Sequence, residues 1–415
     1  MRSDSTKRLR DRGYTLQSKL DILLDITTSI NENYSKNALF LNFKNILIEE
    51  LNIGKFSFYF YDTAWQLVMN EGVDKTIAEA INPLTLLSNY SEIEVLGASE
   101  SDILSSYDVI IPIYNKNIVT AYLLLADLDD KKGEVSPIIK HLKFIQTLGN
   151  IIAVALENKQ LLKSQIKQLG MQKELELAQK MQTMLFPKKL PQNKDLAVKA
   201  FYQPHYEIGG DYYDVIQISE DKTAICIADI SGKGISAAIL MASFQATLHA
   251  LLSFESNDLK KLIEAANQKV IDAARYEKFI TLFIAIYDSK NNSLNYINAG
   301  HQPAILYQNG NYKLLSKGCT VLGMFDKLPE IETETISLNT NDNLYCYTDG
   351  ISEIIVNGGK QLEVSGIIEH IEKHGNKIDI VVANISTLIQ NKNKEKERED
   401  DITFLAAHFR PRASV

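Results

Sequence analysis

Cysteine, proline and glycine are all scarce in this sequence, and each shortage narrows what the protein can be. The 415 residues include three cysteines, nine prolines and twenty glycines. So few prolines and glycines leave little room for a long disordered region. The cysteines, Cys226, Cys319 and Cys346, show no C-x-x-C spacing, and two of them lie inside apolar runs. We therefore expect buried, reduced thiols.

Long apolar runs are also missing. No window approaches eighteen uninterrupted apolar residues, and the richest runs, Ala121–Ala126 and Ile151–Leu156, have the length of core strands or helix faces. A basic tail at residues 1–14, with its charges between Arg2 and Arg12, is followed by mixed polar residues and not by the apolar stretch of a signal peptide. These absences predict a cytoplasmic protein without membrane insertion.

The chain also lacks an excess of basic residues. Lys and Arg number 44 against 52 Asp and Glu, which gives a net charge of −8. This balance argues against nucleic acid as the main partner, because phosphate-binding surfaces need clustered Lys and Arg. The composition is otherwise that of a globular protein, 45% hydrophobic and 23% charged. A length of 415 residues exceeds what one core usually organises, so we expect two domains and a connector.

Residues 15–157 have the pattern helix, strands, helix. An amphipathic start between Leu16 and Ile30 leads to a helical stretch at Phe40–Leu51 and then to the alternating run FSFYFYD at Phe56–Asp62. In DVIIPIYNKNIVTAYLLLAD, a polar turn at Tyr114–Asn117 separates two apolar runs and predicts a strand pair. This order resembles the GAF domain, a small sensory α/β fold. The half has no cysteine to attach a bilin and no cyclic-nucleotide signature, so its signal is an unknown small molecule or protein.

Residues 137–188 predict a long helical linker. Ser136 and Pro137 have the residue types of a helix cap and first position. Two apolar seams follow, first Ile145, Leu148, Ile152, Ala155, Leu162, Ile166 and Leu169, then, after Gly170, Met171, Leu175, Ala178 and Leu185. Either the helix packs on its own domains and changes face at Gly170, or it forms a parallel dimeric coiled coil whose register break transmits a signal. We prefer the second interpretation, which predicts a homodimer.

The C-terminal half changes to many short strands divided by turns. Helices are expected at Ser236–Phe254, Leu259–Arg275 and Ile378–Asn391. The mixture favours an α+β layered fold with strands at its centre, which we assign to residues 189–410. The charged run NKNKEKERE before Asp400 is interpreted as a solvated helix end or loop.

Four acidic sites stand at the ends of, or beside, apolar strand-like runs. They are GGDYYD with Asp211 and Asp214, ICIADISGKG with Asp229, LYCYTDGISE with Asp349 and Glu353, and EDDITFLAAHF with Asp400 and Asp401. A strand end holds a carboxylate rigidly and projects it into a cleft. A single D-G pair is usually a turn, but four such sites together indicate one shared site.

Carboxylates without His or Cys partners favour hard cations such as Mg²⁺ or Mn²⁺, which prefer oxygen ligands. Without cations, carboxylates in one cleft repel each other, and some stay protonated near neutral pH. Two cations can acidify a bridging water and neutralise charge on a phosphoryl group during in-line displacement. The acidic sites therefore indicate hydrolysis of a phosphomonoester.

The ordered motifs GGDYYD, ADISGKG, NAGHQPA, YTDGISE and DDITF resemble the sporulation stage II protein E type within the PPM superfamily of protein phosphatases. The stretch ELAQKMQTMLFP at Glu176–Pro187 resembles the segment just upstream in that family, so the resemblance covers about Leu175–Phe409. It implies a central β-sandwich flanked by helices and activity on phosphoserine or phosphothreonine. It also implies a STAS-domain antagonist of an anti-sigma factor as the substrate.

The resemblance further implies ligands for two divalent cations, Mn²⁺ or Mg²⁺. Carboxylates would come from Asp211, Asp229, Asp349 and Asp400, and a backbone carbonyl from Ile230. Ligation is not carried over to Asp214, Glu353 or Asp401, whose roles are expected to be structural or supporting.

Two further residues of these motifs have other expected roles. His301 lies in GHQPA, where relatives often carry more prolines, and it is expected to stabilise a turn. Lys233 lacks the spacing of a G-x-x-x-x-G-K-[ST] loop, so no residue is assigned to hold the phosphate.

Three alternative functions fit less well. GGDYYD is similar to the GGDEF hairpin of diguanylate cyclases, but YYD replaces EF, and a long helix rather than a D-x-D strand precedes Gly209. A sensor histidine kinase needs a phosphoacceptor helix and an Asn-rich ATP site, and we find neither. A catalytically silent scaffold that binds the same partner is disfavoured because all four aspartates are present, and clustered carboxylates without cations destabilise a fold.

Overall fold

The computed structural model describes residues 2–96, 103–126, 137–255, 258–356, 360–374, 377–392 and 400–410. The chain divides into two compact units, Met1–Leu169 and Gly170–Val415. The expected helix cap Ser136 and residues 393–399 of the charged run NKNKEKERE lie outside the described residues.

The first unit is built on a five-stranded sheet of order β2-β1-β5-β4-β3. Its elements are α1 (Arg2–Asn31), α2 (Lys36–Asn45), the π-helix η1 (Ile46–Glu50), β1 (Phe56–Tyr61), β2 (Trp65–Glu71), α3 (Lys75–Ala80), the π-helix η2 (Pro83–Leu87), β3 (Glu94–Val95), the 3-10 helix η3 (Leu104–Ser106), β4 (Val109–Asn115), β5 (Ile118–Leu125) and the first part of α4 (Pro137–Thr183). Side chains of β1 alternate between two cores: Phe58 packs with α1, α2 and α4, and Tyr59 packs on the opposite face of the sheet.

Most expected elements of this half are present. The strand pair is confirmed, since β4 and β5 pair antiparallel around a turn at Lys116 and Asn117. Helix α1 is longer than expected, because the backbone is already helical from Arg2 through the basic tail. The first seam of α4 is partly used within the unit: Ile145, Leu148 and Ile152 lie in its own core. That part of the seam is therefore not available to a partner helix.

The second unit contains two sheets packed as a sandwich. One sheet has the order β13-β10-β9-β8-β7 with β14 paired to β10, and the other has the order β12-β11-β15-β18-β6. After the rest of α4, its elements are β6 (Leu196–Gln203), β7 (Tyr212–Gln217), β8 (Lys222–Ile230), α5 (Ile235–Glu255), α6 (Leu259–Ala274), β9 (Ile280–Asp288), β10 (Ser293–Ala299), β11 (Ala304–Gln308), β12 (Asn311–Leu315), β13 (Gly318–Cys319), β14 (Glu334–Ser337), β15 (Asn343–Tyr347), α7 (Asp349–Ser352), β16 (Ile355–Val356), β17 (Lys360–Gln361), α8 (Glu363–His374), α9 (Ile378–Lys392) and β18 (Ile402–Phe409).

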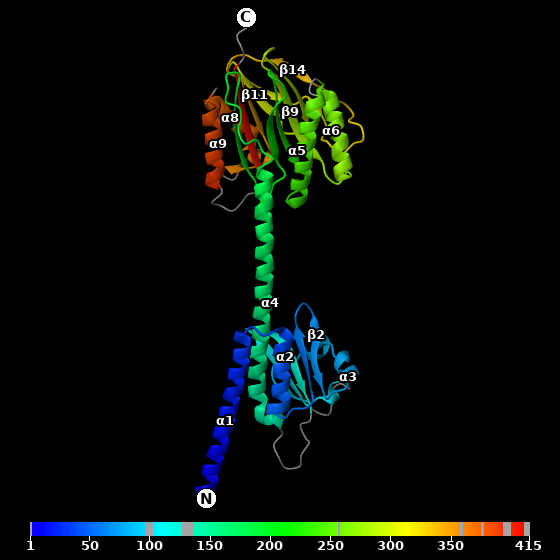
Figure 1. Ribbon diagram of the computed structural model, residues 1–415, viewed down its shortest axis with the longest axis vertical. Coiled ribbons are helices and arrows are strands. Elements are labelled where there is room, and N and C mark those ends of the chain that lie inside the picture. Colours follow the sequence, from blue (N-terminus) through cyan, green and yellow to red (C-terminus); the bar gives the residue numbers. More distant parts are fainter. Residues whose placement is uncertain are drawn as a thin grey trace. The chain divides into compact units, whose positions relative to one another are not determined.

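Helices cover both outer faces of this sandwich. Helices α5 and α6 cover one sheet, and α8 and α9 cover the other (Figure 1). Strand β8 shows why its sequence is a continuous apolar run: Ile225 and Ile227 face the other sheet, while Cys226 faces α5 and α6. Burial on both faces removes the alternation of apolar and polar residues that a half-exposed strand shows.

The expected helices of this half are observed as α5, α6 and α9, but α8 was not predicted. Only Ile367 and Ile371 of α8 are buried, and Gly366 in its first half weakens the helical pattern. The three thiols are free; Cys226 and Cys346 are buried, whereas Cys319 is only partly buried.

Helix α5 is the one described helix that is long and apolar enough to cross a membrane. This is weak evidence, because the core helix of a soluble protein passes the same test. Met241, Phe244 and Leu248 of α5 lie in the core between this helix and the sheet.

Candidate active site

The four acidic motifs meet at one edge of the sandwich. Asp211 directly precedes β7, and Asp229 is the penultimate residue of β8, which pairs with β7. In the other sheet, Asp349 follows β15 and Asp400 precedes β18, and these two strands also pair. Each sheet therefore brings two of the aspartates to its end by strand pairing.

Asp211 links the two sheets, because it precedes β7 of one sheet and its side chain contacts residues at the ends of β15 and β18 in the other. Its carboxylate is 1% exposed and accepts hydrogen bonds from Thr348 Oγ1 at 2.8 Å and Thr403 Oγ1 at 2.5 Å. Burial and the charge of Asp229 raise the pKa of Asp211 well above its usual range, and the Thr403 hydroxyl opposes this shift. The two hydroxyls thus hold a buried carboxylate in a fixed orientation.

Asp229 lies where the negative charge is most concentrated. Its pKa is raised to about 7, first by burial and then by the charges of Asp349, Asp400 and Asp401. The pKa of Asp349 is also raised, first by burial and then by Asp400. Lys233 opposes both shifts, and its Nζ lies 3.2 Å from Asp400 Oδ2. The cluster therefore favours positive charge beside it.

Asp401 binds backbone amides of the loop that contains Gly209, Gly210 and Asp211 (the GGD loop). Its carboxylate accepts hydrogen bonds from the amides of His205 at 2.7 Å and Gly210 at 2.5 Å. A Cβ at Gly209 would lie 2.6 Å from Asp401 Oδ2, and a Cβ at Gly210 would lie 2.9 Å from the carbonyl oxygen of Ile230. Glycine is therefore required at both positions for this close approach, which also brings the Ile230 carbonyl next to the loop that carries Asp211.

Asp214 points away from these aspartates. It is buried beneath α5, where its carboxylate accepts hydrogen bonds from Tyr212 Oη at 2.6 Å and the Val215 amide at 2.7 Å. His249 Nε2 of α5 lies 2.7 Å from the same carboxylate. Tyr212 and Asp214 are two residues apart on β7, so their side chains share the face that α5 covers. Asp214 thus anchors α5 to the sheet.

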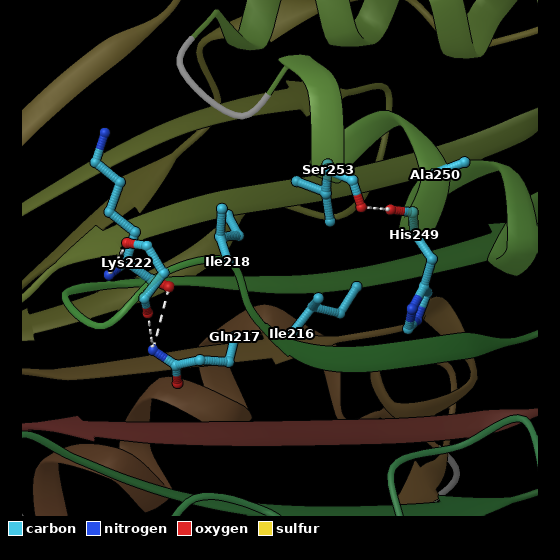
Figure 2. A pocket seen from close by; sticks show the side chains of 9 residues that line it. Ile216, Gln217, Ile218, Lys222, His249, Ala250 and Ser253 are labelled. Atoms are coloured by element: carbon cyan, nitrogen blue, oxygen red, sulfur yellow. Dashed lines mark hydrogen bonds between the residues drawn. The ribbon is translucent and has the colours of Figure 1, made fainter.

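A pocket of about 650 Å³ lies beside His249, between α5 and the β7–β8 hairpin. Figure 2 shows His249 and Lys222 at its two sides, with Ile216 and Ile218 between them. None of the five residues expected to ligate metal lines this pocket. It is therefore separate from the acidic cluster.

His301 is buried behind the site, as expected of a residue that stabilises a turn. Its Nδ1 lies 2.8 Å from Thr281 Oγ1, and its amide donates to Asn298 Oδ1 at 2.7 Å. Burial lowers its pKa to about 4, and the backbone of Tyr347 opposes this only in part. His301 is therefore neutral at pH 7. Glu353 is the C-cap of α7, and its amide donates to the carbonyl of Asp349 at 3.0 Å.

The donor set of this cluster, which consists of oxygen atoms only, fits hard cations. In the described ranges, no group of three or more His, Cys, Asp or Glu side chains is arranged to hold one ion. Asp211 accepts hydrogen bonds from two hydroxyls, and Asp400 pairs with Lys233. Oxygen donors with raised pKa values are what Mg²⁺ or Mn²⁺ would stabilise in the charged form.

Reasoning from the sequence missed Thr348 and Thr403. Both lie inside motifs that had been singled out for their aspartates, YTDGISE and DDITF. Their position in the sequence could have identified them, because each threonine lies close to a strand end that also carries an aspartate expected to ligate metal.

Comparisons with known proteins concern mainly the second unit. Residues 219–410 match the family model described as Stage II sporulation protein E (SpoIIE). Phosphoserine phosphatase RsbU of Bacillus subtilis is 32% identical over 207 residues, which are 48% of this chain and 59% of that protein. Phosphoserine phosphatase RsbP of the same organism is 31% identical over 192 residues, which are 45% of this chain and 46% of that protein. This chain thus spans roughly half the length of both relatives.

A solved structure agrees on the fold. The SiaA PP2C domain of Pseudomonas aeruginosa superposes with a TM-score of 0.51 at 18% identity, covering 59% of this chain and 98% of that domain. The expected sandwich with flanking helices is confirmed by the two packed sheets and by this likeness of fold. The second unit of this chain therefore contains a region similar to the Stage II sporulation protein E (SpoIIE) family, and its fold is similar to that of a PP2C domain.

Proposed function

We propose that this protein is a metal-dependent phosphatase that removes phosphate from phosphoserine or phosphothreonine of a signalling protein. The observation that carries the proposal is the environment of Asp229, whose pKa is raised to about 7 by burial and by three neighbouring carboxylates. A protein keeps such a cluster at a cost in stability, and bound cations offset that cost. The similarity to two phosphoserine phosphatases supports the same reaction.

Five groups would hold two divalent cations, Mn²⁺ or Mg²⁺. They are the carboxylates of Asp211, Asp229, Asp349 and Asp400 and the carbonyl of Ile230. When bound, the cations lower the pKa of a water molecule and neutralise charge on the phosphoryl group. The chain itself orients Asp211 through Thr348 and Thr403, and it holds the GGD loop through Asp401.

The substrate would be a phosphorylated STAS-domain antagonist, because the motifs resemble the family that acts on such proteins. In the first unit we propose a GAF-like sensor for an unknown small molecule or protein. Its helix order and its central sheet support this assignment. The protein would act in the cytoplasm, without nucleic acid and without membrane insertion.

The linker would transmit the signal in a homodimer. On α4 beyond the core of the first unit, Leu162, Ile166 and Leu169 are 54%, 62% and 58% exposed. Met171 is 59% exposed after the phase change at Gly170. An exposed apolar seam on a long helix is stabilised when a second copy of the same helix covers it.

Hydrolysis of p-nitrophenyl phosphate tests the activity. Turnover should appear with Mn²⁺ or Mg²⁺ and disappear with EDTA. Release of inorganic phosphate from a phosphoserine peptide then tests the substrate class. The alternative is a catalytically silent scaffold that binds the same partner, and absence of turnover with every cation would favour it.

A further inference from the structure

The loop between β8 and α5 places a lysine against the acidic cluster. Lys233 Nζ lies 3.2 Å from Asp400 Oδ2, and the side chain of Lys233 is 42% exposed. One side of the ammonium group therefore faces the carboxylates, while another remains accessible from solvent. An ammonium group in this position can contact both the cluster and a molecule that approaches it from solvent.

The loop around Lys233 has a defined backbone. Gly232 and Gly234 on either side have φ values of +85° and +74°, which favour glycine. Ser231 exchanges hydrogen bonds with Phe279: its amide donates to the Phe279 carbonyl at 2.9 Å, and its hydroxyl accepts from the Phe279 amide at 2.8 Å. Lys278 Nζ donates to the Ser231 carbonyl at 2.9 Å. These contacts fix the backbone of the loop from which the Lys233 side chain extends.

We propose that Lys233 binds the phosphoryl oxygens of the substrate. When cations occupy the cluster, Lys233 would exchange its contact with Asp400 for a contact with the phosphoryl group. The inference rests on the proposed phosphatase function. Cations neutralise Asp400, so the attraction between Asp400 and Lys233 weakens, and a phosphoryl dianion becomes the stronger partner. Lysine is a compact point charge with three donors, which suits phosphate oxygens.

Lys233 would position the group without exchanging a proton. Water attacks phosphorus, the bond from phosphorus to the serine oxygen breaks, and the serine oxygen gains a proton as inorganic phosphate leaves. Lys233 contacts only phosphoryl oxygens that keep their bonds to phosphorus. Its loss should therefore weaken binding of both substrate and phosphate.

A simpler role for Lys233 is neutralisation of the cluster before cations bind. That role and the proposed one make different predictions for phosphate. If Lys233 only neutralises carboxylates, Lys233→Met leaves phosphate affinity unchanged. If Lys233 also binds the phosphoryl group, the same change weakens phosphate binding while Mn²⁺ binding stays equal or becomes tighter, because a competing cation has been removed.

The experiment uses the full chain with Lys233→Met, Lys233→Arg and the control Lys290→Met, which changes an exposed lysine in the turn after β9. Calorimetry measures Mn²⁺ affinity and then the affinity of the Mn²⁺-loaded protein for inorganic phosphate. Steady-state kinetics with a phosphoserine peptide give kcat and KM. For Lys233→Met we expect about 10- to 100-fold weaker phosphate binding and a similarly higher KM, the usual effect of losing a charge-assisted hydrogen bond. Lys233→Arg should recover part of the loss, and Lys290→Met should match the wild type.

Two outcomes would overturn this assignment. One is wild-type phosphate affinity in Lys233→Met, and the other is weaker Mn²⁺ binding in that variant. A wild-type protein that binds Mn²⁺ and hydrolyses the peptide would still support the proposed function in either case. A wild-type protein that neither binds Mn²⁺ nor hydrolyses the peptide would contradict both the role of Lys233 and the proposed function.

Discussion

At the residue scale, Asp349 allows the direct test of the cluster. Its replacement in Asp349→Asn removes one of the charges that raise the pKa of Asp229. We expect Mn²⁺-dependent turnover to fall by about 100-fold or more, the effect of losing one electrostatic stabiliser of a transition state. The fold should remain, and thermal melting in EDTA should occur at an equal or higher temperature because repulsion decreases. The measurements are initial rates and circular dichroism.

Asp379→Asn is the matched control, since Asp379 is an exposed aspartate that pairs with Lys199 on the surface. It should keep wild-type turnover. Normal turnover in Asp349→Asn would show that the assigned carboxylates are not the site.

His301 gives a pH dependence whose sign follows from its burial. Its pKa is lowered from 6.5 to about 4 in the folded protein, so between these values the unfolded chain binds a proton that the folded chain does not. The free energy of unfolding should therefore fall as pH decreases from about 6.5 to about 4, by up to about 3 kcal/mol. Urea unfolding in EDTA at a series of pH values measures this.

The comparison variant for this prediction is His301→Gln. Its stability relative to the wild type should improve as the solution becomes more acidic, because the variant has no imidazole to protonate. A difference between the two proteins that stays constant from pH 7 to pH 4 would contradict the assignment of this acid sensitivity to His301.

Residue types in the sequence predicted where several carboxylates of the candidate site lie, but they did not predict what each carboxylate contacts. Asp229 and Asp349 were expected at strand ends, and the structure places them there. Asp214 could not be distinguished from Asp211 by composition alone. Strand geometry separates them, because three residues along β7 turn a side chain to the other face. The partner of Asp214, His249, is 35 residues away in sequence and has no local signal.

At the element scale, the attachment of α5 to β7 depends on that pair. His249→Ala leaves the buried carboxylate of Asp214 without its imidazole partner. We expect a loss of about 1–3 kcal/mol in the free energy of unfolding of the second unit. The double variant with Asp214→Asn should lose less than the sum of the two single changes, because the residues interact directly. Additive losses in a double-mutant cycle would argue against the pair.

The exposed part of α4 makes a second prediction for an element. Leu162→Glu puts a charge on the apolar seam and should raise the dissociation constant of the proposed dimer by at least about tenfold. Lys163→Glu, at the next position and also exposed, changes the charge outside the seam and should have a smaller effect. Sedimentation equilibrium measures both. A wild-type protein that stays monomeric at high concentration would remove the basis for a coiled-coil dimer.

At the scale of the whole molecule, the relation between the two units is open to a simple test. A truncated chain that begins at Gly170 contains the second compact unit. If the first unit regulates the phosphatase, the truncated and full-length proteins should differ several-fold in Mn²⁺-dependent turnover of p-nitrophenyl phosphate. Equal turnover per molecule would show that the first unit does not control this activity under those conditions.

The sequence by itself indicated which residue types would form the candidate site and most of the order of the elements. Strand ends, the paired glycines and oxygen-only donors can be recognised locally, because each depends on residue type and on neighbours along the chain. The tertiary structure decided which groups meet: Thr348 and Thr403 with Asp211, Asp401 with the Gly210 amide, and Lys233 with Asp400. These contacts join segments far apart in the chain, and strand pairing and helix packing set their distances. Composition and local pattern carry no information about that packing.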